Sequence, residues 1–461
     1  MSSRKLARPA RHQSLRRKSG RFFVPGSIRL PVQQYIHTEE MGGAVLLAAT
    51  VLALILANSS IGQTYFAVLE TSISLSIGPV AITKDVQHWI NEGLLVLFFF
   101  VVGLEIKREI VSGALSTVRR ATLPALAATG GMIVPAGIYL LLTPREHWGG
   151  WAVPIASDTA FVLGVLALVG GRSRQSLRVL LLATMVVDDV LAVAVIAGFY
   201  SREIAIQYLL AAAGLVLVIL FLQRLAGFNG WMFAVLGVAL WLTFLQSGIH
   251  ATMGGIVLGL LVPAEPHYRY ENFHPSLNQL HSTFQSAFNR SDQESAEVVL
   301  GQIGDLARGT EPPLERIERA AHIWSAFIVL PIFALANAGV PLSPGAVSAS
   351  LQHPVTQGIA VGLIFGKPIG IVLLVWVGLR LGVADLAREI NWRQITGIGL
   401  LAGMGFTMSI FIAELAFADP ILRIHSKTGI LLASAVSGVL GFMFLKAPHR
   451  AAMQSEAHQH G

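Results

Sequence analysis

The sequence has no cysteine, little charge and no nucleotide-binding loop, and each absence excludes a class of protein. Without cysteine among its 461 residues, the chain has neither a disulfide framework nor a thiolate metal site. Charged residues make up only 13% of it, whereas soluble domains average roughly 25%. No Gly-rich loop ends in Lys-Ser or Lys-Thr, so an ATP-driven machine is not expected.

Long apolar segments are abundant instead. The chain is 54% hydrophobic, and many segments approach the roughly 20 residues that cross a bilayer as a helix. We therefore expect an all-α membrane protein with twelve transmembrane helices. The segments lie at about 41–58, 88–106, 121–143, 151–170, 177–200, 207–223, 230–246, 249–263, 321–341, 356–381, 394–418 and 426–446.

The positive charges predict the orientation of these helices. If the N-terminus is cytoplasmic, 27 of the 33 Lys and Arg residues lie on that side, 5 lie outside, and one, Lys367, lies within a span. This asymmetry predicts that both termini are cytoplasmic. The first 30 residues carry nine Lys or Arg and no adequate apolar run, which argues against a cleavable signal peptide.

The same pattern predicts the organisation of the chain. A basic tail at 1–40 either lies on anionic lipids or is merely solvated. Transmembrane helices 1–8 occupy 41–263, a partly helical cytoplasmic insert occupies 264–320, helices 9–12 occupy 321–446, and a cytoplasmic tail occupies 447–461. The role of the insert stays open.

Four ionisable residues lie deep in apolar segments: Asp158, Asp188, Asp189 and Lys367. An ionised Asp at the bilayer centre costs about 2.5–3.5 kcal/mol, so such residues are functional by default. Neighbouring residues on a helix point about 100° apart. We therefore expect one aspartate of the pair to meet Lys367 and the other to face a water-filled cavity. Lys367 is then a counter-charge, a proton-handling group or both.

Two segments have sequences typical of interrupted helices. The fourth contains Pro154 and the polar pair Ser157-Asp158, and the eleventh contains four glycines before Thr407 and Ser409. Inverted repeats whose discontinuous helices cross at the midplane are a recurrent transporter design, and we expect it here. Asp158 would offset exposed helix N–H groups or act only as a cap, while Thr407 and Ser409 also fit simple packing.

This chemistry suits the exchange of a cation for protons. A carboxylate held away from water binds protons more readily, and its oxygens are ligands for small hard cations. A bound proton must leave before the cation binds. Two titrating groups that serve one monovalent cation move net charge, so electrogenic exchange is expected. At the predicted cytoplasmic mouth, Glu105, Glu109, Glu318 and His322 form either a pH-responsive network or an ordinary interfacial charge belt.

Three other functions fit the sequence less well. A proton-coupled carrier of a larger solute needs more aromatic and polar groups within the spans than are present. An intramembrane protease needs its two aspartates on different helices, whereas Asp188 and Asp189 are adjacent. A passive channel would show repeated acidic rings.

Eight stretches, in order over about 41–446, resemble the bacterial NhaA family of Na⁺/H⁺ antiporters. They are Gly103–Glu109, Gly130–Pro135, Ser157–Leu168, Val187–Val190, Ser247–Thr252, Leu330–Val340, Gly366–Gly370 and Gly405–Ile412. The resemblance implies a cofactor-free antiporter of the bacterial inner membrane that is not an enzyme. It would extrude one Na⁺ or Li⁺ for about two protons, under pH regulation, for sodium and pH homeostasis. Expected partners are these ions and the lipid bilayer. A homodimer is left open, and nucleic acid is not expected.

The resemblance also implies roles for individual residues. Asp188 and Asp189 match the family's essential pair, with Asp189 as the principal carrier of Na⁺ and protons and Asp188 as the partner of Lys367. Asp158 matches the acidic residue of the broken fourth helix, and Ser157 takes the place of a threonine. A pH-sensing role is implied by two further matches: Glu105, Glu109, Glu318 and His322 fall on the cytoplasmic cluster, and His250 matches a histidine linked to pH response. Without the resemblance, His250 would be an interfacial histidine.

The chain departs from the family pattern at three positions. Arg319 stands where a histidine is common, Ile323 replaces a usual proline, and Glu414 stands where a small residue is expected. The role of Glu414 stays open.

Overall fold

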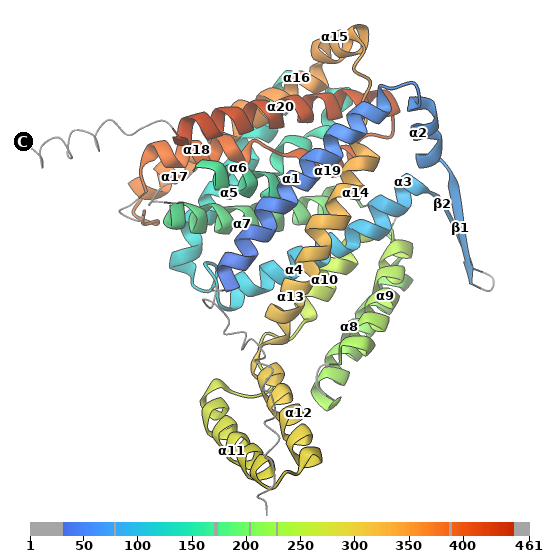
Figure 1. Ribbon diagram of the computed structural model, residues 1–461. Coiled ribbons are helices and arrows are strands. Elements are labelled where there is room, and N and C mark those ends of the chain that lie inside the picture. Colours follow the sequence, from blue (N-terminus) through green and yellow to red (C-terminus); the bar gives the residue numbers. More distant parts are fainter. Residues whose placement is uncertain are drawn as a thin grey trace, which may run out of the picture.

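The computed structural model describes residues 31–77, 80–169, 174–201, 204–226, 229–386 and 390–446. Within these ranges the chain is helical apart from one β-hairpin (Figure 1). Its first elements are α1 (Pro31–Ala57), α2 (Gly62–Leu69), β1 (Ser72–Ile77), β2 (Val80–Asp85), α3 (Val86–His88), α4 (Leu95–Val111), α5 (Val118–Leu142), α6 (Thr159–Val169), α7 (Arg174–Phe199), α8 (Ile206–Ala226), α9 (Gly230–Ser247) and α10 (Thr252–Leu261). They are followed by α11 (Tyr270–Asn289), α12 (Gln293–Thr310), α13 (Pro313–Trp324), α14 (Leu330–Asn337), α15 (Pro344–Gln352), α16 (Pro354–Val361), α17 (Lys367–Arg380), α18 (Trp392–Ala402), α19 (Phe406–Ala416) and α20 (Pro420–Lys446).

Helix length and composition identify a multi-pass membrane protein. Seven helical stretches among the described residues are long and apolar enough to cross a membrane, and two bent pairs, α1 with α2 and α18 with α19, raise the number to nine. The expected twelve also included 88–106, 151–170 and 249–263. There a π-helical stretch, Trp89–Leu94, precedes α4, and the other two segments hold α-helices of only 11 and 10 residues. These three segments account for the difference between the twelve expected spans and the nine that the described helices provide.

The β-hairpin was not anticipated by the sequence analysis. Strands β1 and β2 pair antiparallel with Ser72 opposite Asp85. The hairpin lies beside α2 and α3 and projects from the body of the molecule (Figure 1). An extended pair of six-residue strands is too short to register as a span, so a search for long apolar runs passes over it.

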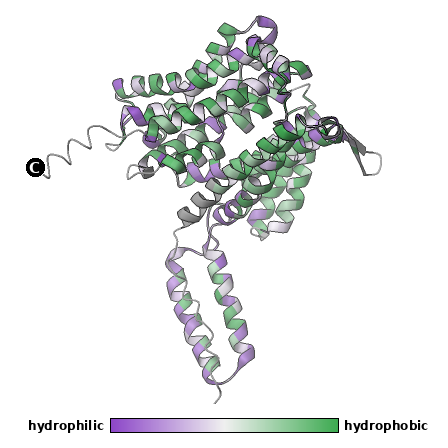
Figure 2. Ribbon diagram, turned by 45° about the horizontal axis from the view of Figure 1, so that its top comes forward, coloured by the Kyte–Doolittle hydropathy of each residue, from purple (hydrophilic) through white to green (hydrophobic). Residues whose placement is uncertain are grey.

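The predicted insert at 264–320 contains a helical hairpin. Helices α11 and α12 pack on each other and extend away from the apolar body, and Figure 2 shows many hydrophilic residues along both. Ala287, Val299 and Leu306 are buried between them. The hairpin leads into α13, whose first turn is tied back by the Leu314 N–H, which donates to the Pro263 carbonyl at 3.1 Å.

Helix α5 packs against both helices that form the buried Asp188–Lys367 pair. They are α7, which carries Asp188 and Asp189, and α17, which begins at Lys367. Gly130 of α5 faces Gly370 of α17 so closely that a Cβ on either would collide with the other's backbone. These glycines therefore let the α5 and α17 backbones touch, which brings Lys367 toward α7.

The fourth and eleventh apolar segments both lose helical structure near their middle. A 3₁₀ turn at Val153–Ile155 is followed by three non-helical residues before α6 begins at Thr159. Helix α18 ends at Ala402, and α19 begins at Phe406 after a bend of 46°. The two interruptions bond to each other: the Asp158 N–H donates to the Met404 carbonyl at 2.7 Å, and the Ser157 hydroxyl donates to the Ala402 carbonyl at 2.9 Å. Backbone groups freed from one helix thus find partners in the other segment.

Candidate functional site

Asp188 forms the ion pair that the sequence analysis expected with Lys367. The Lys367 ammonium lies 2.8 Å from Asp188 Oδ2 and donates a second hydrogen bond to the Ser157 hydroxyl at 2.6 Å. Lys367 is only 1% exposed. A buried ammonium needs partners for its charge and its N–H groups. Asp188 and Ser157 supply these partners and so offset the free-energy cost of burying Lys367. The contact joins α7, α17 and the interruption of the fourth segment.

Asp158 is held by the N-terminus of α19. Its Oδ2 accepts hydrogen bonds from both the Thr407 N–H at 2.9 Å and the Thr407 hydroxyl at 2.5 Å, while its Oδ1 accepts from the Phe161 N–H at 3.1 Å. A carboxylate at a helix N-terminus is favourably placed because exposed N–H groups and the helix dipole both stabilise negative charge. Asp158 therefore accepts hydrogen bonds from the N-termini of two helices, the adjacent α6 and the distant α19.

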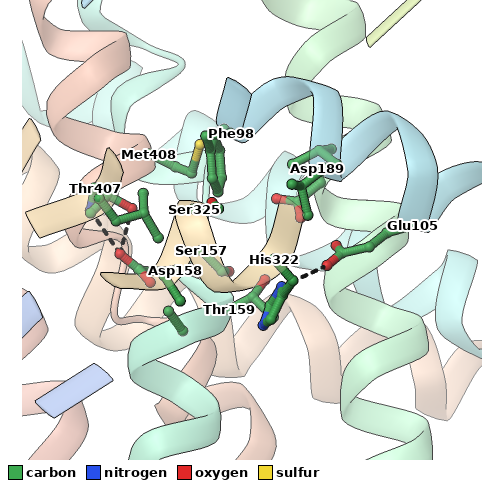
Figure 3. A pocket seen from close by; sticks show the side chains of 15 residues that line it. Phe98, Glu105, Ser157, Asp158, Thr159, Asp189, His322, Ser325, Thr407 and Met408 are labelled. Atoms are coloured by element: carbon green, nitrogen blue, oxygen red, sulfur yellow. Dashed lines mark hydrogen bonds and ion pairs between the residues drawn. The ribbon is translucent and has the colours of Figure 1, made fainter. Parts of the chain in front are cut away.

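Asp189 faces a cavity rather than an ion-pair partner. The cavity measures about 50 Å³ and is lined by Asp189, Asp158 and Ser157 together with side chains from α4, α13, α14 and α19. In Figure 3 the Asp189 carboxylate points toward the space between His322 and Phe98. The side chain is buried, with 6% of the residue exposed. Among the described residues, no hydrogen bond or ion pair to its carboxylate is found, in contrast to Asp188 and Asp158.

Four of the five predicted pH-responsive residues divide into two groups. Glu105 and His322 line the same cavity as Asp189, with 3.9 Å between Glu105 Oε1 and His322 Nδ1 (Figure 3). Glu318 and Glu109 instead share Arg108: its Nη1 contacts Glu318, and its Nη2 lies 3.3 Å from Glu109 Oε1. The structure thus links these acidic groups to the cavity through α4 and α13.

His250 lies away from the cavity wall. Its Nδ1 is 3.0 Å from the Thr252 hydroxyl, and its ring packs edge-on against Phe411 at a centroid distance of 5.1 Å. Phe411 belongs to α19, so His250 touches the helix whose N-terminus holds Asp158.

Sequence reasoning undervalued two hydroxyl residues of the cavity. Thr407, which also fitted simple packing, is the main partner of Asp158, and Ser325 was not singled out although it lines the cavity. Ser325 follows His322 by three residues, so helical spacing gives it the same face, and this spacing was the available signal.

The geometry favours reversible binding of a proton or a small cation over a permanent metal centre. No group of three or more His, Asp or Glu side chains within the described ranges is close enough to hold a metal ion. The cavity instead offers three carboxylates, of Glu105, Asp158 and Asp189, and four hydroxyl side chains, of Ser157, Thr159, Ser325 and Thr407. Such oxygens suit a hard cation, and 50 Å³ is enough for a water-sized particle but far below the roughly 300 Å³ of small-molecule sites.

Comparison with known proteins also indicates an exchanger of a cation for protons. A family model described as Na⁺/H⁺ antiporter 1 matches residues 33–445. The chain is 42% identical over 416 residues to the Na⁺/H⁺ antiporter NhaA of Rhodopirellula baltica, covering 90% of this chain and 93% of that one. It is 40% identical over 425 residues to the Na⁺/H⁺ antiporter NhaA 2 of Syntrophotalea carbinolica, covering 91% and 96%. It is 41% identical over 415 residues to the Na⁺/H⁺ antiporter NhaA 2 of Pseudomonas putida, covering 89% and 91%.

Proposed function

The chain belongs to the NhaA family of Na⁺/H⁺ antiporters, and from this premise we propose that it extrudes one Na⁺ or Li⁺ in exchange for about two protons. Members of this family are transporters and not enzymes. The proposal concerns what the family assignment leaves open: the residues that carry the ions, the net charge moved and the regulation by pH.

The observation that carries the proposal is that Asp158 and Asp189 share one cavity. Carboxylate oxygens bind either a hard cation or protons, and the two ligands compete for the same atoms. We assign Asp189 as the principal carrier, because it faces the cavity without a partner among the described residues. Asp158, Ser157, Asp188 and Lys367 complete the proposed binding site.

Electrogenic exchange follows from the number of carboxylates. If protons leave two titrating groups when one monovalent cation binds, each cycle moves net charge across the membrane. The Asp188–Lys367 pair is neutral as an ion pair, with 2.8 Å between the charged atoms, so Asp158 and Asp189 are our candidates for the two proton-binding groups.

We also propose a membrane arrangement for the chain. Both termini and the 264–320 insert face the cytoplasm of a bacterial cell, and the irregular helices supplement the long ones to make twelve spans in two inverted repeats. Alternating access then requires the two interrupted segments, which bond to each other at Asp158 and Met404, to cross near the bilayer midplane.

Regulation by pH is assigned to the groups next to the cavity. Glu105 and His322 line it, while Glu109 and Glu318 pair with Arg108 on the same two helices, α4 and α13. Because a histidine changes charge between about pH 5 and 8, protonation of His322 alters the field that acts on Asp189. His250 contributes through its ring contact with Phe411.

Current measurements on solid-supported membranes test the proposed function. We expect a Na⁺ or Li⁺ concentration jump on proteoliposomes to give a transient current that shrinks as the pH falls, because protons compete for the same oxygens. Liposomes without protein are the control. Na⁺ uptake without current would exclude the electrogenic stoichiometry, and the absence of both Na⁺ uptake and proton movement would exclude antiport.

Thr407→Val tests the role of the α19 N-terminus. Valine keeps the shape of threonine and leaves the backbone N–H bond to Asp158 intact, but it removes the hydroxyl bond of 2.5 Å. We expect the Na⁺ concentration for half-maximal exchange to rise about tenfold, as for other groups that orient a ligand, with little change in maximal rate. An unchanged half-saturating concentration, measured as Na⁺-dependent proton flux, would show that Asp158 does not need this bond.

A proton-coupled carrier of an organic solute is not favoured by the cavity. Its volume of about 50 Å³ is several times smaller than sites for such ligands, which start at roughly 300 Å³. The size fits a dehydrated or partly hydrated inorganic cation.

A further inference from the structure

The end of α19 far from Asp158 carries a buried ion cluster that the proposed exchange chemistry does not use. Glu414 Oε2 lies 3.0 Å from Arg423 Nη1, and Glu414 Oε1 lies 2.6 Å from Lys427 Nζ. The side chain of Glu414 is 9% exposed, that of Lys427 10% and that of Arg423 28%. The Glu414 carboxylate thus forms ion pairs with two cationic side chains in a largely buried position.

The position of Glu414 in its helix is unfavourable without these cations. It lies in the last turn of α19, where the helix dipole disfavours negative charge. Burial adds a desolvation cost. Both costs are offset only while Arg423 and Lys427 of α20 stay in contact. Arg423 also donates from Nη2 to the Ala418 carbonyl at 3.0 Å, so its guanidinium holds the corner between α19 and α20.

The other end of α19 is the end that holds Asp158. Thr407 and Glu414 are seven residues apart, which is two helical turns or about 10 Å along the axis, on the same side of the helix. Between them, Ser409 donates to the Ala156 carbonyl at 3.4 Å, and Phe411 packs on Phe99 at a centroid distance of 5.3 Å. Helix α19 is therefore a short helix that follows a helix break and makes polar contacts at both of its ends.

We propose that Glu414 is a positioning residue, which fixes α19 against α20 and thereby holds Thr407 against the Asp158 carboxylate. The inference rests on the proposed function, because it assumes that Asp158 helps to bind Na⁺. Glu414 itself touches neither the cavity nor the carboxylates that line it.

The expected consequence is a change in ion affinity from a remote site. Without the carboxylate, Arg423 and Lys427 repel each other and the C-terminal end of α19 loses its ionic attachment to α20. The Thr407 bonds to Asp158 Oδ2 then depend on packing and on the neighbouring Phe406 N–H, which donates to the Ser434 hydroxyl of α20 at 3.3 Å. Since small displacements of ligand-orienting groups weaken binding and catalysis strongly, the half-saturating Na⁺ concentration rises while the exchange chemistry stays intact.

The test compares Glu414→Gln, which keeps size but removes charge, with Glu414→Asp, which keeps the charge. In proteoliposomes with a pH-sensitive dye, we expect Glu414→Gln to raise the half-saturating Na⁺ concentration about fivefold, with the maximal rate within about twofold of the wild type. Glu414→Asp should stay close to the wild type, since the flexible Lys427 side chain can follow the shorter carboxylate. A lower melting temperature with unchanged half-saturation would mean that Glu414 only stabilises the fold and would overturn the proposal.

A double-mutant cycle shows whether Glu414 acts through Thr407. If it does, Glu414→Gln should raise the half-saturating Na⁺ concentration by a smaller factor in the Thr407→Val background than in the wild type, because the hydroxyl bond is already lost and only the backbone N–H bond remains to be weakened. Multiplied effects of the two substitutions would contradict this route.

Two further variants separate the possible failures. Asp385→Asn breaks an exposed ion pair, with Arg119, and should change nothing. If Glu414→Gln does not fold, Arg423→Gln leaves the Glu414–Lys427 pair in place and should raise half-saturation by a smaller factor; no rise would overturn the proposal. If the wild type exchanges ions and Glu414→Gln has the same kinetics, only this inference is rejected. If the wild type shows no exchange, both the proposed function and the inference are rejected.

Discussion

Asp189→Asn is expected to reduce Na⁺-dependent proton exchange to the level of protein-free liposomes. An asparagine of the same shape can neither release a proton in the working pH range nor supply a carboxylate oxygen to a cation. Loss of a group that only orients a ligand already lowers affinity or activity by about 10–100-fold, and Asp189 is proposed to be the ligand itself. The readout is Na⁺-driven dye quenching in proteoliposomes, followed from acidic to alkaline pH so that a shifted profile is not mistaken for inactivity.

The same substitution should leave the protein folded. The Asp189 carboxylate has no ion pair or hydrogen bond to lose among the described residues, so its replacement takes no partner away from another buried group. Melting temperature in detergent should therefore stay at or above the wild-type value. The matched control is Asp385→Asn, which makes the same chemical change where the side chain is 71% exposed. Substantial exchange by folded Asp189→Asn would remove Asp189 from the role of carrier.

Lys367→Met is expected to destabilise the protein more than any other single substitution considered for this site. It leaves the Asp188 carboxylate buried without its cation and the Ser157 hydroxyl without a donor. Breaking one side of a buried ion pair costs about 3–5 kcal/mol. The expected result is a clear loss of thermal stability in detergent, together with weaker exchange.

A compensating variant distinguishes this cause from a packing defect. Asp188→Asn combined with Lys367→Met removes both charges, and stability should recover most of the loss because no unpaired charge remains. If the double variant is as unstable as the sum of the single ones, the ion pair is not the origin of the effect. The recovery should appear in melting temperature whether or not exchange returns.

The buried charges and the helix breaks could be anticipated from the sequence because each carries a local cost. Asp188, Asp189 and Lys367 stand out in apolar segments, and the ion pair follows because a buried lysine needs a carboxylate. Pro154 and the glycines before Thr407 point to interrupted helices in the same way. Of these expectations, the Lys367–Asp188 contact is present in the structure, while the ion-carrying roles stay predictions.

What the sequence did not reveal are partners that are far apart in the chain or locally ordinary. Nothing in the neighbourhood of Thr407 indicates that it bonds to a residue 249 positions away. The sequence predicts the twelfth segment at 426–446, whereas α20 begins at Pro420, which puts Arg423 in the same helix as Lys427, about one turn before it. The β-hairpin at Ser72–Asp85 has the alternating pattern of a strand, but a search for runs of about 20 apolar residues does not detect it.

The bond between the two interrupted segments has a consequence for biosynthesis. Asp158 and Thr407 are 249 residues apart, and ribosomes add about 5–20 residues per second, so roughly 12–50 s separate the appearance of the two partners. Lys367, the partner of Asp188, also emerges long after it. During that interval the nascent chain holds in the membrane acidic side chains whose later partners are still unmade. A polypeptide truncated before α17 would therefore keep Asp158 and Asp188 without the partners that Thr407 and Lys367 give them in the complete chain.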